Sequence, residues 1–279
     1  MNWSRVKTIL IILFLLIDLL LVGGILWSAA PQNPVSLQEV ADVVNILKRN
    51  GLQISDKIIP RATEELGVVE LDNAWPDREL CASILFGGNR LSQLAPGSYG
   101  DAGKQVTFGS NYFTYTNSSV TCNNPEEAAA YLGEMGISVL PADIYDQNGK
   151  WVSQQKIDDK TIFETALEIP QEAGSFTCSD YWLLSNKEVN LNKKPAASLQ
   201  PITSVLVEFT ANPYYNREGD TILSITTGYS LGTVYRDTTH KLVSVVPAYK
   251  IALQSGEYYI YDALSGEFSY GLKNGNVIY

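Results

Sequence analysis

One segment of the chain carries residue types that could perform hydrolytic chemistry. The sequence "GYSLG" at 228–232 matches the G-x-S-x-G pattern of serine hydrolases, and Asp237 and His240 follow it. In such enzymes the serine lies on a sharp turn between a strand and a helix, and the histidine comes from a distant loop. Here the residues around Ser230 alternate as in a strand, and an acid and a histidine this close could not converge on it. We therefore expect Ser230 to be a polar strand residue between glycines, not a catalytic one.

The sequence evidence for a metal site or for a pair of catalytic acids is weaker than that for a serine hydrolase. The chain has one histidine, which excludes a multi-histidine metal site. The segment "DIYDQNG" (143–149) is similar to a calcium loop, but Ile144 stands in place of the first required Asp and Gln155 replaces the closing Glu. Paired acids that are adjacent in sequence do not face one another on a helix and alternate across a strand, so we expect solvated surface pairs. These pairs are Glu64-Glu65, Glu126-Glu127 and Asp158-Asp159. We predict no catalytic, cofactor-binding or metal-binding residue, and no enzyme activity.

The charge of the chain excludes one class of partner. The sequence has 20 basic and 30 acidic residues, a net charge of −10. An acidic surface repels nucleic acid, so we predict no nucleic-acid partner. Three cysteines, Cys81, Cys122 and Cys178, cannot all pair within one chain. The sequence is compatible with a disulfide between two of them and with three buried free thiols.

The elements that position these residues alternate between helices and strands. Ser36 and Glu39 form a capping-box pattern before a helix that ends at Gly51, and Asn124 and Pro125 begin a second helix over 123–136. A third helix is expected over 201–212, with a strand as the alternative because the segment is rich in β-branched residues. Asn148-Gly149 predicts a hairpin turn. Strands are expected at 81–87, 104–110, 111–116, 150–157, 161–169, 175–185, 221–235, 241–253 and 257–264, and a Gly-rich loop at 94–103.

This pattern predicts an α+β fold, with helices packed on antiparallel sheets in two lobes. We expect this α+β region to follow a single N-terminal transmembrane helix. We expect a cytoplasmic leader at 1–7, a transmembrane signal anchor at 8–27, a linker at 28–35, an N-terminal extracytoplasmic lobe at 36–122 and a C-terminal extracytoplasmic lobe at 123–279.

The anchor is predicted from length and composition. The run from Thr8 to Trp27 is twenty residues and contains eight Leu and five Ile, enough to cross about 30 Å of hydrocarbon as a helix. A central Asp18 costs about 2.5–3.5 kcal/mol, less than the apolar residues contribute. Arg5 and Lys7 precede the run, which predicts a single-pass protein of the cell membrane with a cytoplasmic N-terminus. The alternative is a signal peptide cleaved near Ser28-Ala29-Ala30.

Asp18 predicts a contact inside the membrane. Polar groups and close packing hold transmembrane helices together, because the bilayer supplies no hydrophobic force between them. An acid within a span is therefore a functional-site hypothesis. Its alternative is a tolerated acid on a very apolar helix. The predicted interface with a partner helix comprises Asp18 and the residues that share its face at helical spacing, Ile11, Phe14, Leu15, Leu21, Val22 and Ile25.

Segments at both ends resemble one known family. The leader "MNWSRVKTILIILFLLIDLLLV", the connector "LPADIY" and the closing "VPAYKIALQSGEYYIYDALSGEF" resemble the YycI (WalI) family. The resemblance implies a mixed α/β exterior related to the membrane-distal domains of YycH. It also implies a membrane-anchored regulator of the WalK–WalR (YycG–YycF) two-component system, which governs cell-wall metabolism in low-GC Gram-positive bacteria. The implied partners are the sensor histidine kinase of WalK (YycG) type, a YycH-like companion and the membrane.

Two functions of different classes follow. The first is a non-enzymatic regulator that binds a sensor kinase through its span and its outer lobes. The second is a membrane-tethered, wall-associated hydrolase or ligand-binding receptor. A PepSY-like protease inhibitor is a third hypothesis, which rests on the terminal strands alone. An assay for turnover separates the first from a hydrolase.

Overall fold

A computed structural model describes most of the chain after residue 34. Two residues before that point, Phe14 and Asp18, are also described. The described ranges are 35–62, 64–72, 78–87, 92–101, 103–109, 112–117, 121–134, 137–171, 175–179, 190–215, 219–236 and 241–279.

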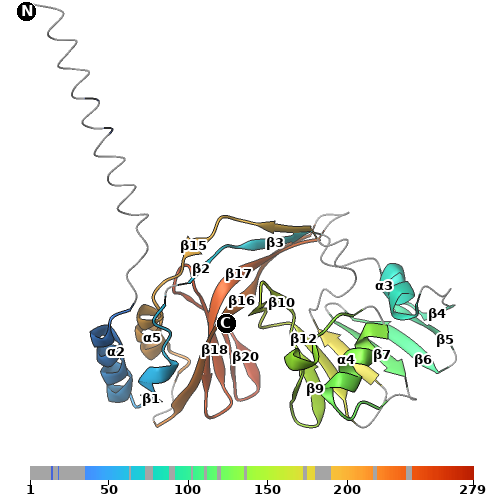
Figure 1. Cartoon of the computed structure of the whole chain (residues 1–279), viewed down its shortest axis with the longest axis horizontal. Coiled ribbons are helices and arrows are strands. Elements are labelled where there is room, and N and C mark those ends of the chain that lie inside the picture. Colours follow the sequence, from blue (N-terminus) through green and yellow to red (C-terminus); the bar gives the residue numbers. More distant parts are fainter. Residues whose placement is uncertain are drawn as a thin grey trace, which may run out of the picture.

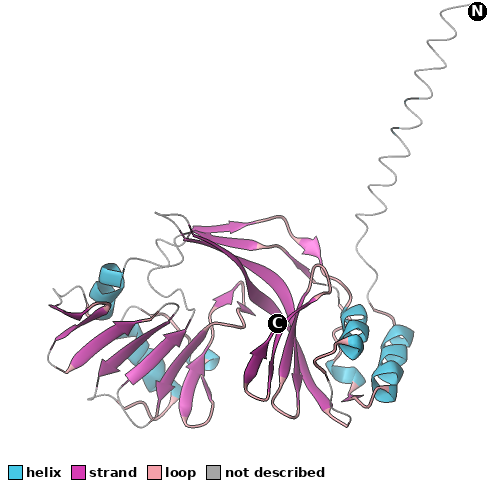
Figure 2. Ribbon diagram, turned by 180° about the vertical axis from the view of Figure 1, so that it is seen from behind, coloured by secondary structure: helices cyan, strands magenta, loops and turns pink. Residues whose placement is uncertain are grey.

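The described residues form two lobes, each a twisted sheet with helices on one face (Figures 1 and 2). The first lobe takes its strands from 53–72 and 190–278, and the second lobe takes its strands from 92–179. The predicted α+β fold with helices on antiparallel sheets is therefore confirmed. The boundary predicted between residues 122 and 123 does not follow the sheets, because β7 (Tyr112–Asn117) pairs with β13 (Ser175–Ser179) across it.

An eight-stranded sheet forms the first lobe. Its longest strands, β16 (Thr221–Arg236) and β17 (Lys241–Leu253), pair antiparallel, and the other strands of the sheet extend from this pair on either side. The short β1 joins β16 in parallel, and β3 joins β17 and β14. A separate pair, β2 (Glu65–Leu66) and β15 (Ala197–Ser198), lies beside it. The remaining strands are β1 (Gln53–Ile54), β3 (Val69–Asp72), β14 (Asn190–Lys193), β18 (Tyr258–Asp262), β19 (Phe268–Lys273) and β20 (Asn276–Ile278).

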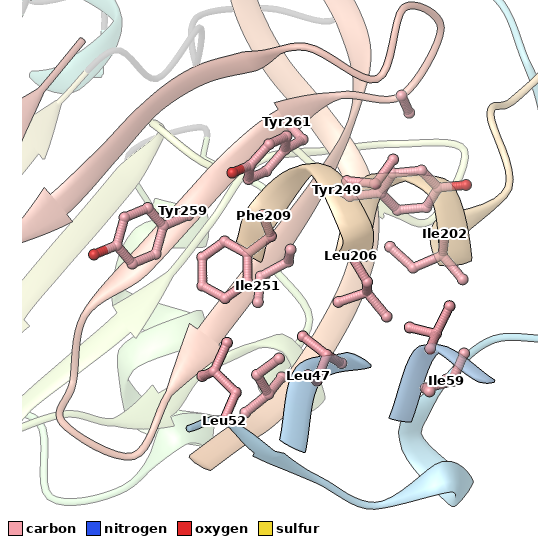
Figure 3. Close-up of a cluster of buried hydrophobic side chains, with 14 of the residues drawn as sticks. Leu47, Leu52, Ile59, Ile202, Leu206, Phe209, Tyr249, Ile251, Tyr259 and Tyr261 are labelled. Carbon is pink, nitrogen blue, oxygen red and sulfur yellow. The ribbon is translucent and has the colours of Figure 1, made fainter. Parts of the chain in front are cut away.

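Helices α2 (Leu37–Arg49) and α5 (Ile202–Ala211), with the 3-10 turn η1 (Asp56–Ile58), cover one face of this sheet. The predicted capping box is present, with the Ser36 hydroxyl accepting from Glu39 N and the Glu39 carboxylate accepting from Ser36 N. Figure 3 shows the core between the layers. There the ring of Phe209 lies 5.1 Å from that of Tyr259 in an edge-on arrangement. Burying these side chains on both layers holds the helices to the sheet.

The second lobe is also an eight-stranded sheet, in the order β4-β5-β6-β7-β13-β12-β9-β8. Helices α3 (Arg78–Leu85) and α4 (Pro125–Glu134) pack on it, and the 3-10 turn η2 (Pro141–Asp143) lies against α4. The predicted turn at Asn148-Gly149 is confirmed, since both residues have positive φ, 56° and 77°. The other strands are β4 (Ser92–Ala95), β5 (Ser98–Asp101), β6 (Lys104–Phe108), β8 (Tyr145–Asp146), β9 (Lys150–Ser153) and β12 (Ala166–Pro170).

Between β9 and β12 the chain leaves the second lobe and forms the hairpin of β10 (Lys156–Ile157) and β11 (Lys160–Thr161). We name residues 154–165 the arm. Figure 1 shows its β10 beside β16 of the first lobe. An isolated parallel bridge joins Ile162 to Tyr229 of β16. The arm is thus a part of the second lobe's chain that is packed on the first lobe.

Four predicted elements differ from the structure. The predicted strands 150–157 and 161–169 are each interrupted, because the chain enters the arm after β9 and leaves it before β12. The sequence predicts a strand over 81–87, but residues 81–85 belong to α3, because Ala82 and Leu85 recur three residues apart on one buried face. The segment 94–103 was expected as a loop, but Ala95 pairs with Ser98 across a turn at Pro96-Gly97, where Gly97 has a φ of 75°. Gly97 and Gly103, both with positive φ, lie in the turns of two short hairpins, and Gly100 lies within β5.

Candidate functional site

The predicted intramembrane interface falls largely outside the described residues. Phe14 and Asp18 are described, and both are helical and exposed. Ile11, Leu15, Leu21, Val22 and Ile25 lie outside the described residues, as does the rest of the predicted anchor at 8–27. Within the part of the chain that is described, no helix is both long enough and apolar enough to span a membrane.

The G-x-S-x-G segment lies inside a continuous strand. β16 runs through all five residues to Arg236, and Tyr229, Ser230 and Leu231 pair in register with Pro247, Val246 and Val245. The strand prediction for Ser230 is therefore confirmed, and the strand–turn–helix arrangement of a hydrolase elbow is not present at this position. Asp237 and His240 lie outside the described residues.

The two glycines of this segment are explained by close packing. A Cβ on Gly228 would lie 2.5 Å from the Thr161 carbonyl oxygen and 2.7 Å from Cζ of Phe163, both in the arm. A Cβ on Gly232 would lie 2.7 Å from Oγ of Ser244 on the neighbouring strand. Neither glycine has a positive φ. The first glycine thus makes room for the arm and the second makes room within the sheet.

Ser230 is buried and forms a hydrogen bond with the arm. Its side chain is 1% exposed, and its Oγ donates to Oε1 of Glu164 at 2.5 Å. Oε2 of Glu164 is also buried. Sequence reasoning did not single out Glu164, and no pattern around it marks it, because its partner lies 66 positions away.

Three further polar side chains, those of Tyr270, Lys250 and Tyr258, gather around this pair. Burial raises the pKa of Tyr270, and the negative charge of Glu164 and a hydrogen bond with that carboxylate raise it further. The ammonium of Lys250 lies 4.4 Å from the ring centroid of Tyr258 and 5.8 Å from that of Phe163. Burial lowers the pKa of Lys250, and the charge of Glu164 opposes this shift. We name Glu164, Ser230, Lys250, Tyr258 and Tyr270 the polar cluster.

The arm is seated by apolar contacts as well. Ile157, Ile162 and Phe163 are 6%, 0% and 8% exposed, and each belongs to a small core shared with first-lobe residues such as Tyr229, Val245 and Ala248. Each such burial is worth about 1.5–3 kcal/mol. The partly exposed ion pairs of Lys160 with Glu64 and of Lys193 with Asp158 contribute about 1 kcal/mol or less each. Apolar packing and the buried hydrogen bond therefore carry most of the attachment.

The acidic pairs have separate partners. Glu64 binds Lys160 of the arm and Asp158 binds Lys193, whereas Glu127 accepts from Asn123 N, just before α4, at 2.9 Å. That backbone hydrogen bond is the main reason that the pKa of Glu127 is lowered. One member of each pair is therefore used in a local contact with a lysine or a backbone amide.

The described residues contain no group of three or more His, Cys, Asp or Glu side chains placed to hold a metal ion. The acids of the calcium-loop-like segment are used locally. Asp143 binds Lys156 at 2.6 Å, and Asp146 accepts from Gly149 N at 3.1 Å in the hairpin turn. Cys122 is a free, buried thiol, whose pKa is raised by burial and then by the charge of Glu127. The side chains of Cys81 and Cys178 are outside the description.

Comparison with known proteins adds little to this geometry. No family model matches the chain, and no curated protein matches it. A solved structure of an uncharacterized protein from Eubacterium rectale ATCC 33656 is similar, with a TM-score of 0.43 and 10% sequence identity over 82% of this chain and 98% of that chain. A likeness at this level assigns neither a family nor a function.

Proposed function

We propose that the protein is a non-enzymatic, membrane-anchored regulator of a sensor histidine kinase of the WalK (YycG) type. It acts with a YycH-like companion in controlling cell-wall metabolism. In this proposal residues 8–27 span the cell membrane, the N-terminus is cytoplasmic and both lobes are extracytoplasmic. The sequence resemblance of the leader and of the closing segment to the YycI family supports it, and that resemblance is its sole support at the level of the family.

The single observation that carries the proposal is Asp18 near the centre of an apolar run of twenty residues. A carboxyl group in hydrocarbon is costly unless it meets a polar partner, and in a single-pass protein that partner comes from another chain. A hydrogen bond between spans is worth only about 0.6–2 kcal/mol, so it sets the register of the helices more than their affinity. Packing of the neighbouring side chains and contacts of the lobes supply the rest.

The burial and the hydrogen bond of Ser230 support a protein that acts by binding partners more than one that hydrolyses a substrate. The hydroxyl that a nucleophile would need is 1% exposed and donates to Glu164. Its motif is accounted for by packing, since Gly228 and Gly232 are both placed where a Cβ would meet a neighbour.

Variants of the full chain in membranes test the proposal. Asp18→Leu should leave the protein membrane-bound and weaken its co-purification with the kinase or the companion, because the polar contact is lost. Asp18→Asn should retain most of it, since an amide can still form a hydrogen bond. A matched control, Asp18→Leu combined with Leu20→Asp, keeps the composition but moves the acid about 200° around the helix. It should behave like Asp18→Leu.

Two results would contradict the proposal. Co-purification that is unchanged in all three variants would show that Asp18 makes no contact. Substrate turnover by the purified full chain that is lost in Ser230→Ala would favour the hydrolase instead.

A further inference from the structure

The arm is the place where the two lobes share a hydrophobic core among the described residues. The main core of the second lobe consists of second-lobe residues alone, and the core beneath α2 and α5 consists of first-lobe residues alone. The small cores around Ile162 and Phe163 combine arm residues with residues of β3, β16, β17 and β18. The arm thus provides the shared apolar contact between the lobes.

Directional contacts fix the arm on β16 at one register. Phe163 N donates to the Tyr229 carbonyl at 2.9 Å, and in the next residue pair Ser230 Oγ donates to Glu164. Gly228 allows the Thr161 carbonyl to lie directly against β16. A shift by one residue would place Tyr229 or Thr227 at this point, where no space for a side chain exists.

The neck of the arm is braced where it returns to the second lobe. Gln154 Nε2 donates to the Phe163 carbonyl at 2.9 Å, and Gln155 N donates to Thr165 Oγ1 at 2.8 Å. The same Thr165 hydroxyl donates to the Ile162 carbonyl at 2.7 Å, and its side chain is fully buried. Ala166 of β12 follows at once. The two sides of the neck are therefore joined to each other immediately before the second sheet begins.

The arm also carries ion pairs to both lobes. Lys156 binds Asp143 of the second lobe at 2.6 Å, whereas Lys160 binds Glu64 of the first lobe at 2.5 Å. Asp158 at the tip binds Lys193, also of the first lobe.

We propose that the arm is a clamp that sets the orientation of the second lobe on the first, with the Gly228 contact and the Ser230–Glu164 hydrogen bond as its seat. A seated arm holds the second lobe in one orientation relative to β16. A released arm removes this constraint on the orientation of the second lobe. The clamp is independent of which partner the protein binds, so it can fail while the proposed function stands.

Two glycine variants of the full chain in detergent test the clamp. Gly228→Ala places a methyl group against the arm, whereas Gly232→Ala places the same group against Ser244 within the same strand. Hydrogen exchange of the Phe163 amide should rise about tenfold or more in Gly228→Ala, corresponding to about 1.4 kcal/mol of local stability. It should not change in Gly232→Ala. Ser230→Ala should give an intermediate rise, and it supplies the test if Gly228→Ala fails to fold.

A distance measurement addresses the orientation itself. Fluorophores attached through non-natural amino acids at the exposed Asn45 of α2 and the exposed Thr107 of β6 report on the two lobes. Single-molecule energy transfer should give one narrow distribution for the unmodified chain and for Gly232→Ala, and a broad one for Gly228→Ala. A narrow distribution in Gly228→Ala despite fast exchange of the arm would overturn the proposal, as would unchanged exchange of the arm in both Gly228→Ala and Ser230→Ala.

Discussion

Ser230 and Glu164 are joined by a hydrogen bond of 2.5 Å, although they come from different lobes. The serine belongs to β16 of the first sheet, and the glutamate belongs to the arm that extends from the second. The segment with the spacing of a hydrolase motif therefore forms part of the contact between the two lobes.

Replacing Ser230 by Ala should destabilise the protein. Hydrogen bonds to charged groups contribute about 1.5–3 kcal/mol, and the substitution leaves a buried carboxylate without this donor. Denaturant unfolding should therefore show a loss of that size. The control is Ser224→Ala, an exposed serine of the same strand, which should change stability by about 0.5 kcal/mol or less. Equal losses in the two variants would mean that the contact with Glu164 does not stabilise the fold.

Stability should fall at high pH because buried tyrosines resist ionisation. Burial, followed by the charge of Glu64, raises the pKa of Tyr249 to about 12, and burial also raises the pKa of Tyr215 to about 12. The folded state then binds more protons than the unfolded state above about pH 10, so the free energy of unfolding decreases with pH. The stabilisation is fully present below about pH 10 and is lost as the pH rises towards 12.

Denaturant unfolding at several pH values, with phenolate absorbance as a second signal, measures this effect. Tyr249→Phe should reduce the steepness of the decline above pH 10. It should also lower stability by about 1 kcal/mol at neutral pH, because the Tyr249 hydroxyl donates to the Gln200 carbonyl. An identical pH slope in the variant would contradict the assignment.

The capping box of α2 should contribute to the stability of the first lobe. Ser36→Ala removes the side-chain acceptor for Glu39 N and should cost about 0.5–2 kcal/mol. Amide exchange in the first turn of α2 should rise with it. Gln38→Ala, an exposed change in the same turn, is the control. The prediction fails if the two variants have the same unfolding midpoint.

The sequence predicted elements whose ends carry local signals. Ser36 with Glu39, Asn124 with Pro125, and Asn148 with Gly149 are such signals, and the structure has a helix, a helix and a hairpin turn at these places. The spacing of its apolar residues also predicts α5 as a helix, although its β-branched residues are compatible with a strand. Its apolar face is buried in the core beneath α2.

The errors arose where tertiary contacts decide the outcome. The described buried positions of α3 are Ala82 and Leu85, but the apolar run 81–87 taken alone fits a buried strand equally well. The lobe boundary was missed because strands distant in sequence complete each sheet, such as β3 of the first lobe, which precedes the whole second lobe. Glu164 was missed for the same reason, since nothing nearby in sequence indicates a partner on β16.

The account depends most on the predicted face of the anchor, and photo-cross-linking in intact membranes tests it directly. A photoreactive residue is placed in turn at each position from 9 to 27, and adducts with the kinase and the companion are measured. We predict maxima at Ile11, Phe14, Leu15, Asp18, Leu21, Val22 and Ile25, which share one helical face. A flat profile, maxima on the opposite face, or a mature chain that has lost these residues would contradict it.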